Sequence, residues 1–171
     1  MNKLCILLFL VFSIFLSSCN TQRHLTGNSN SPVVLSRKLG FKVTRHDNLK
    51  LYTESARWLN TPYRSGGYSP KGVDCSGLVR QLYKKVYGIT LPRTAAGMAT
   101  GKCRRITKND LKTGDLVFFN TGKKRKGINH VGIFLKNGYF IHSSTSKGVI
   151  ISNLKENYYR KTWKQGGRIK H

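Results

Sequence analysis

Apolar residues recur with helical spacing between residues 74 and 88. The run follows Asp74 and stops before Gly88, and its apolar positions are Leu78, Val79, Leu82, Tyr83 and Val86. An acceptor side chain suits the position before a helix, and glycine suits the position after it. The pattern predicts a helix of about three turns with Asp74 as its N-cap, which places Cys75 in the first turn.

A second helical pattern lies upstream, and short apolar segments dominate the rest of the chain. Tyr52, Ala56 and Leu59 keep i, i+4, i+7 spacing in a helix that begins near Asn48. The segments that read as strands are residues 116–119, 131–135, 139–143, 149–152 and 167–169. Helices followed by short strands predict an α+β domain, with N-terminal helices packed on an antiparallel sheet of about five strands.

After Lys3, Leu4 to Leu16 is an almost unbroken apolar stretch, too short for a comfortable membrane span. Leu16-Ser17-Ser18-Cys19 looks like a bacterial lipobox, in which Cys19 is lipidated and becomes the mature N-terminus. The alternative is an ordinary secretory signal cleaved near Ser18. We expect a signal segment over residues 1–19, a basic tether over 20–44 and one domain over 45–171, in a protein anchored by lipid in the periplasm, with the outer membrane favoured.

The chain is strongly basic, with 31 Lys and Arg, 6 Asp and Glu, and a formal net charge of +25. Such a charge indicates nucleic acid or another anionic partner. Export excludes nucleic acid, which leaves acidic lipids and peptide carboxylates of the cell envelope. The densest basic run, residues 123–126, reads as a solvated loop, with binding to anionic wall material as the alternative.

Two cysteines remain once Cys5 and Cys19 are set aside with the leader, and a disulfide between them would block a nucleophile. We therefore expect Cys75 and Cys103 to be free thiols. At a helix start, backbone N–H groups and the helix dipole favour a negative charge, so we expect a lowered pKa for Cys75. Cys103 has no histidine or acid at useful spacing and reads as structural.

Two histidines on predicted strands complete a layout typical of papain-like thiol hydrolases. His130 opens one strand and is the candidate general base, and His142 is the candidate that orients the imidazole of His130. The Cys75 backbone N–H and the Tyr63 hydroxyl are candidates for the oxyanion hole. A zinc site formed by Cys75, His130 and His142 is an alternative, although no CxxC or HxxxH spacing supports it.

Joint action of the two histidines makes a prediction about backbone register. A two-residue loop at Asn137 and Gly138 would pair Ile133 with His142 and turn the two imidazoles to opposite faces of the sheet. An odd-length loop, or a bulge, would pair Gly132 with His142 and bring both rings to one face. We predict the odd-length loop, with a bulge serving equally.

Several motifs resemble those of the NlpC-type cell-wall cysteine peptidases, and among them the murein endopeptidase lipoproteins. The segments that carry the resemblance lie between Tyr52 and Ile169, and they are Pro62 to Gly67, Gly72 to Val79, Leu91 to Thr94, Thr113 to Phe119, His130 to Phe134 and Phe140 to Ser144. The resemblance implies a papain-like fold and a Cys75–His130–His142 site with Tyr63 near the oxyanion. It also implies that Asp74, Ser76, Arg93 and Thr94 line the substrate groove, with Asp74 and Ser76 holding a substrate amine in some members.

The sequence thus predicts a cysteine endopeptidase that hydrolyses peptide bonds in peptidoglycan stem peptides or cross-links. It predicts no metal or organic cofactor, no nucleic-acid partner and a monomeric state. Two alternatives stay open: an N-acetylmuramoyl-L-alanine amidase of related layout, and a catalytically inactive wall-binding lipoprotein.

Overall fold

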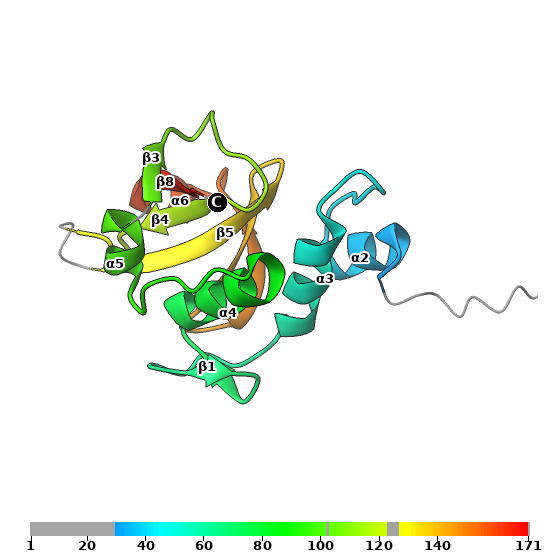
Figure 1. Cartoon of the computed structure of the whole chain (residues 1–171), viewed down its shortest axis with the longest axis horizontal. Coiled ribbons are helices and arrows are strands. Elements are labelled where there is room, and N and C mark those ends of the chain that lie inside the picture. The colour runs from blue at the N-terminus through cyan, green and yellow to red at the C-terminus, as the bar shows by residue number, and fades with distance from the viewer. Residues whose placement is uncertain (1–29, 102, 123–126, 171) are drawn as a thin grey trace, which may run out of the picture.

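The computed structural model describes residues 30–101, 103–122 and 127–170. These residues form an α+β fold in which α2, α3 and α4 lie side by side against one face of an antiparallel sheet (Figure 1). The expected signal segment, Cys19 and the basic loop at residues 123–126 fall outside the described residues. No helix in the described part of the chain is both long enough and apolar enough to span a bilayer.

The helices begin and end where local signals are strongest. Asp74 caps α4 by accepting a hydrogen bond from the Gly77 N–H, and Gly88 ends it in the left-handed conformation. Thr94 and Asn48 cap α5 and α3 in the same way. The helices are α2 (Pro32–Leu39), α3 (Leu49–Trp58), α4 (Cys75–Tyr87), α5 (Ala95–Thr100) and α6 (Asn157–Thr162).

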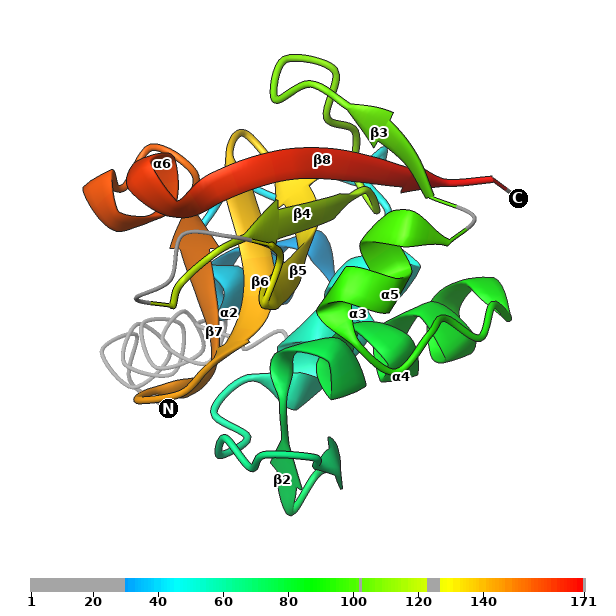
Figure 2. The same ribbon diagram turned by 90° about the vertical axis from the view of Figure 1, so that its left-hand side faces the viewer.

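The sheet has six strands in the order β3-β8-β4-β5-β6-β7, one more than the sequence predicts. Figure 2 shows β8 crossing the molecule between β3 and β4. A separate two-stranded ribbon, β1 (Tyr68–Ser69) with β2 (Gly72–Val73), precedes α4. The main strands are β3 (Cys103–Ile106), β4 (Leu116–Phe119), β5 (His130–Lys136), β6 (Tyr139–Ser144), β7 (Gly148–Asn153) and β8 (Trp163–Ile169).

Each face of the sheet buries its own apolar cluster. On one face Leu116, Ile133 and Ile141 pack with α2, α3 and α4. On the other face Phe119 and Phe140 pack with Tyr159 of α6. Alternation along the strands produces this division, because successive side chains point to opposite faces.

The region expected to be a tether differs from the prediction in its second half. Ser31 caps α2, Pro32 occupies its first turn and Gly40 ends it, and Leu35 and Leu39 are buried in the main cluster. The packed part of the chain therefore begins well before residue 45. The basic composition of this segment concealed a short amphipathic helix, because only two of its side chains, Leu35 and Leu39, are buried.

Candidate active site

Cys75 is the first residue of α4 and lies at the end of a loop that folds back on the helix. The Asp74 N–H donates to the Gly67 carbonyl at 3.2 Å, which brings residues 66 and 67 against the first turn. A Cβ on Gly77 would overlap that same carbonyl oxygen, so this close approach requires glycine. The predicted placement of the thiol at a helix start is confirmed.

A surface pocket opens beside the thiol. Its lining includes six residues that the sequence singled out, namely Tyr63, Asp74, Cys75, Ser76, Arg93 and Thr94. They come from the loop before β1, the start of α4 and the segment before α5, which are distant in the sequence. Cys75 is 9% exposed, so the sulfur is largely buried but accessible from the pocket.

The electrostatic setting of Cys75 corrects one expectation. Burial raises the pKa of the thiol, and the Asp74 carboxylate raises it further. Backbone N–H groups of Val131, Ser76 and Cys75 act in the opposite direction without reversing the shift. The prediction of a lowered pKa was wrong because it counted the helix dipole and left out desolvation.

The two histidines lie next to each other on neighbouring strands. His130 is the first residue of β5, and its Nε2 is 2.9 Å from Nδ1 of His142 on β6. His130 is 8% exposed and His142 1%. Burial lowers the pKa of His130 to about 4 and holds the pKa of His142 well below its usual value, so both rings are neutral at pH 7.

A bulge at Leu135 sets the register that brings the rings together. The loop has two residues, Asn137 and Gly138, both with positive φ, and Lys136 pairs with Tyr139 across it. Between Phe134 and Lys136 the register shifts, so Ile133 pairs with Ile141 rather than with His142. The odd-length loop is therefore not observed, and the bulge that the prediction allowed takes its place.

The sulfur and the imidazoles approach the start of β5 from different sides. Cys75 belongs to the aliphatic cluster, whereas His130 and His142 contact rings of the aromatic cluster. The Val131 N–H, one residue after His130, is directed at the sulfur. Within the described residues no hydrogen bond joins Cys75 to His130. The Nε2 of His130 is occupied by His142, which leaves Nδ1 for the sulfur.

Two hydroxyl groups complete the polar chain behind His142. Nε2 of His142 is 3.0 Å from the Tyr159 hydroxyl and 3.2 Å from the Ser152 hydroxyl. The sequence reading missed both residues. Ser152 was placed on a strand without a role, and Tyr159 lies in α6, a six-residue helix without strong periodicity.

Asp74, Ser76 and Arg93 form a closed cluster on one wall of the pocket. Nη1 and Nη2 of Arg93 donate to the two oxygens of Asp74 at 3.0 and 2.6 Å, and Nη1 also donates to Ser76 Oγ at 2.9 Å. The N–H groups of Gly66 and Gly77 take further lone pairs of the carboxylate. Although burial acts to raise it, Arg93 and the Gly77 N–H hold the pKa of Asp74 below its usual value. A substrate ammonium could reach Asp74 only if the Arg93 pair opened.

Tyr63 lines the same pocket as this cluster. Its backbone bridges to Val73, two residues before Cys75. Burial, followed by the nearby Cys75 and Asp74, raises the pKa of its phenol, so the hydroxyl keeps its proton and can donate a hydrogen bond. This is the property that a side-chain donor to an oxyanion needs.

The sequence also made predictions about the state of the two cysteines and about a metal site. Cys75 and Cys103 are both free thiols, as the sequence predicts. Among the described residues, no three His, Cys, Asp or Glu side chains converge in a way that could hold a metal ion. The ring nitrogens of His130 and His142 face each other, so their lone pairs do not converge with the thiol on a common point.

Comparison with known proteins extends this picture to most of the chain. The sequence profile of the NlpC/P60 family matches residues 60–168. The murein DD-endopeptidase MepS/murein LD-carboxypeptidase of Escherichia coli (strain K12) is 34% identical, and the match covers 92% of this chain and 87% of that protein. The probable endopeptidase NlpC of the same strain is 37% identical, with coverage of 95% and 97%.

A solved structure gives the same result for the fold. The crystal structure of a protein similar to lipoprotein of the NLP/P60 family, from Staphylococcus aureus subsp. aureus Mu50, matches with a TM-score of 0.65 at 27% identity. The match covers 77% of this chain and 46% of the solved chain, so this chain spans less than half of that protein. The predicted α+β fold of NlpC type is confirmed. From the profile, the relatives and the fold together, the chain belongs to the NlpC/P60 family.

Proposed function

We propose that the chain is a cysteine endopeptidase of the cell wall that hydrolyses peptide bonds in peptidoglycan stem peptides or cross-links. The observation that carries the proposal is a thiol at a helix start, open to a pocket and close to the start of β5, where the imidazole of His130 is hydrogen-bonded to that of His142 on the neighbouring strand β6. The activities for which the two Escherichia coli relatives are named support the substrate class.

Catalysis in this site starts from a neutral pair. Because burial disfavours both the thiolate and the imidazolium, His130 takes the thiol proton as the sulfur attacks the carbonyl carbon. The oxyanion receives hydrogen bonds from the Cys75 N–H and the Tyr63 hydroxyl. His130 then gives its proton to the leaving amine, and a thioester remains on Cys75. Water, deprotonated by His130, hydrolyses the thioester and releases the acid.

The remaining residues have supporting roles in the proposal. His142 orients the His130 ring and fixes its tautomer. Arg93 holds Asp74 and Ser76 as one wall of the substrate pocket, and Thr94 contributes to the same wall while capping α5. Because the Asp74 carboxylate and the Ser76 hydroxyl are already paired with each other and with Arg93, this wall meets substrate chiefly through the Arg93 guanidinium, whose side chain is 37% exposed.

We also propose that Cys19 carries the lipid anchor and that the enzyme works in the cell envelope, with the outer membrane favoured. Leu16-Ser17-Ser18-Cys19 supports the anchor, and the wall enzymes among the relatives support the location. Metabolic labelling with a clickable fatty acid tests the anchor. Wild-type chain that gains no label in its bacterial host contradicts the proposal, and Cys19→Ala serves as the background control.

Digestion of purified sacculi tests the enzymatic proposal. Full-length protein should release muropeptides whose masses show cleavage within stem peptides or cross-links. Cys75→Ala should lower release by about 10⁴-fold or more, because it removes the nucleophile. Cys103→Ala, the matched thiol control, should retain full activity. Release unchanged in Cys75→Ala contradicts the proposal, and products cut between the sugar and the first stem residue would instead identify an amidase.

A further inference from the structure

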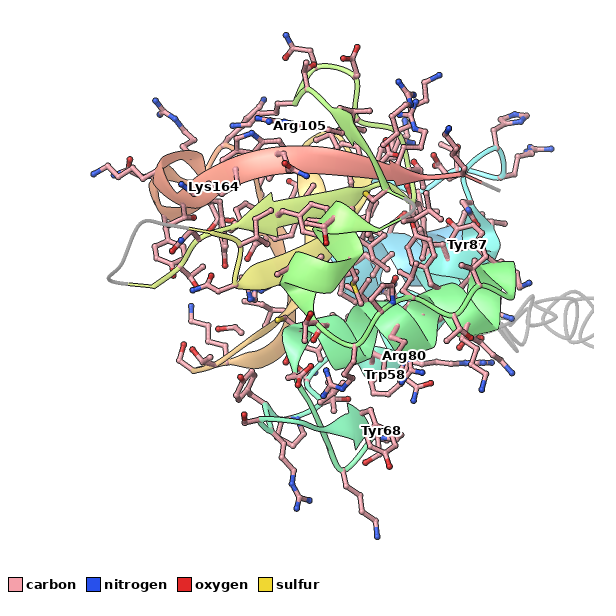
Figure 3. All side chains as sticks on the ribbon, turned by 60° about the vertical axis from the view of Figure 1, so that its left-hand side comes forward. Trp58, Tyr68, Arg80, Tyr87, Arg105 and Lys164 are labelled. Carbon is pink, nitrogen blue, oxygen red and sulfur yellow. The ribbon has the colours of Figure 1, made fainter. Side chains whose placement is uncertain are left out.

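A groove lined by basic side chains runs between β8 and residues 104–112, away from the catalytic pocket. Figure 2 shows β3 and β8 at the opposite end of the molecule from β2, where α4 begins. Figure 3 places Arg105 and Lys164 at this end and Arg80 of α4 at the other. The basic residues of the groove are Arg104, Arg105, Lys108, Lys112, Lys164 and Arg168.

Carboxylates compensate little of this charge. All six acidic residues of the chain lie in the described part, and only Asp110 lines the groove. Asp115 does not line the groove but compensates Arg168. Nε and Nη2 of Arg168 donate to the two carboxylate oxygens of Asp115 at 2.8 and 2.6 Å. Among the described residues, Arg104, Lys108 and Lys112 take part in no ion pair.

One cross-strand pair in the groove brings two cationic side chains together. Arg104 and Arg168 are direct partners across the antiparallel pair of β3 and β8. Like charges directly opposite each other destabilise a sheet. Asp115 already compensates the charge of Arg168, so Arg104 is the member of the pair without a carboxylate partner in the part of the chain that the structure describes, and an anionic ligand beside Arg104 would offset its charge.

We propose that the groove is a second binding site for the wall polymer itself, one that holds carboxylates of stem peptides other than the peptide being cleaved. This inference rests on the proposed function, because it assigns the ligand as the same polymer. Peptidoglycan repeats its carboxylate-bearing peptides along the glycan chain, so one molecule can occupy the pocket and the groove together. Binding at the groove raises the local concentration of scissile bonds without changing the chemistry.

Sedimentation with sacculi tests this site in the Cys75→Ala background, which prevents digestion. The groove variant is Arg104→Gln, Lys108→Gln and Lys112→Gln. The control variant is Lys42→Gln, Arg80→Gln and Lys84→Gln, which removes the same charge from exposed positions elsewhere. At low salt the groove variant should bind sacculi about tenfold more weakly, and the control variant should change binding less than about twofold. High salt should abolish the difference.

Hydrolysis by protein that retains Cys75 separates the groove proposal from the proposed function. The groove variant should cleave a small soluble muropeptide at the wild-type rate and sacculi more slowly. Equal loss of sacculus binding in both variants would overturn the site, because net charge alone would then explain it. Selective loss of binding to vesicles of anionic phospholipid, with sacculus binding intact, would overturn it too. If the wild-type protein cleaves neither substrate but the groove variant alone loses sacculus binding, the result contradicts the proposed function and supports the groove.

A different part of the structure determines which nitrogen of each imidazole carries the proton. His130 can accept the thiol proton on Nδ1 only if its Nε2 is protonated and donates to Nδ1 of His142. His142 must then carry its own proton on Nε2, which needs an acceptor. Ser152 donates its proton to the Tyr159 hydroxyl at 3.3 Å, so Ser152 Oγ and Tyr159 Oη both offer lone pairs to Nε2–H.

The geometry assigns Tyr159 as a positioning residue that fixes the tautomer of both histidines through Ser152. Without the Tyr159 hydroxyl, the Ser152 proton has no oxygen acceptor at that point and turns to Nε2 of His142. The proton of His142 then moves to Nδ1 and donates to His130, whose own proton must lie on Nδ1 facing the sulfur. In that state His130 cannot act as the base.

Nitrogen-15 spectra of the ring nitrogens test this assignment without reference to activity. Tyr159→Phe should move the His142 resonances toward those of the Nδ1–H tautomer and lower kcat by about fivefold, with KM unchanged. Tyr158→Phe, next to it on the same helix and 53% exposed, is the matched control and should change neither.

The reading of the spectra is independent of catalysis. Unchanged His142 resonances in Tyr159→Phe would overturn the assignment, even if kcat fell. Tyr159→Phe that fails to fold would be replaced by Ser152→Ala, which removes the competing donor and should keep the Nε2–H tautomer. Shifted His142 resonances in Tyr159→Phe, together with a wild-type protein that has no hydrolytic activity, would support the assignment and contradict the proposed function.

Discussion

One face of the sheet packs aliphatic side chains against three helices, whereas the other packs aromatic rings around two imidazoles. The aliphatic face carries Leu116, Ile133 and Ile141, all fully buried, and its cluster also includes the nucleophile Cys75 at the start of α4. The aromatic face carries His130, His142 and the two hydroxyl groups behind them. The comparison teaches that the alternation of side chains along the same strands separates the base and its supporting groups from the aliphatic core, which holds the nucleophile.

The first way to test this separation is to remove an imidazole from the aromatic face. His142→Ala should lower kcat on sacculi about 100-fold and leave a residual rate, because the nucleophile and base remain but the base is no longer oriented. Turnover of muropeptides measures the effect, and circular dichroism checks the fold. A rate within twofold of wild type would show that His142 has no orienting role.

The second test removes buried volume from the aliphatic face. Leu116→Ala should cost roughly 2–5 kcal/mol of unfolding free energy, through lost burial and the cavity left behind. At temperatures well below unfolding, kcat should stay near the wild-type value. Urea denaturation measures the cost, and Val33→Ala, at a side chain 70% exposed, should change stability by less than about 0.5 kcal/mol. Equal effects of the two variants would contradict the assignment of the core.

The third test uses pH to report on the buried base. His130, with its pKa lowered to about 4, is neutral above that value and loses its function as a base below it. The kcat/KM should therefore stay level from pH 7 to near pH 5 and fall about tenfold per unit below pH 4. An acid limb centred near pH 6 to 7 would instead indicate a resting thiolate–imidazolium pair.

The smallest effect is expected at the pocket wall. The lowered pKa of Asp74 stabilises the fold above the ordinary carboxyl pKa, and this contribution is lost as pH falls through the folded-state value. Arg93→Met should therefore cost about 1 kcal/mol at pH 7, since the guanidinium is partly exposed, and less at pH 3. Urea denaturation at both pH values measures it. A cost that does not shrink in acid would assign the loss to packing rather than charge.

Much of this architecture could be predicted from the sequence because the signals are local. Asp74, Gly88 and the apolar spacing between them define α4, and apolar runs define β4 to β7. β3 escaped prediction because two of its four residues are arginines, and it is a strand only through pairing with β8. α6 is too short for periodicity to reveal it.

The sequence was enough to predict the catalytic residues, but not their hydrogen-bond partners or their burial. Cys75, His130 and His142 stand out by residue type and by their positions on a helix start and strands. The Ser152 and Tyr159 contacts depend on how β7 and α6 pack against β6, which no local pattern encodes. The pKa direction of Cys75 depends on total burial, which the sequence of one helix start does not contain.

The extra residue at Leu135 makes the register of one hairpin critical for the enzyme. Its carbonyl is held by the hydroxyl groups of Tyr52 and Thr113, so the irregularity is anchored rather than loose. If the strands slipped into a regular ladder around the same two-residue connection, Leu135 would pair with Phe140 and Ile133 with His142. The hairpin would still be well formed, but the His142 ring would point to the opposite side of the sheet from His130 and could no longer orient the base.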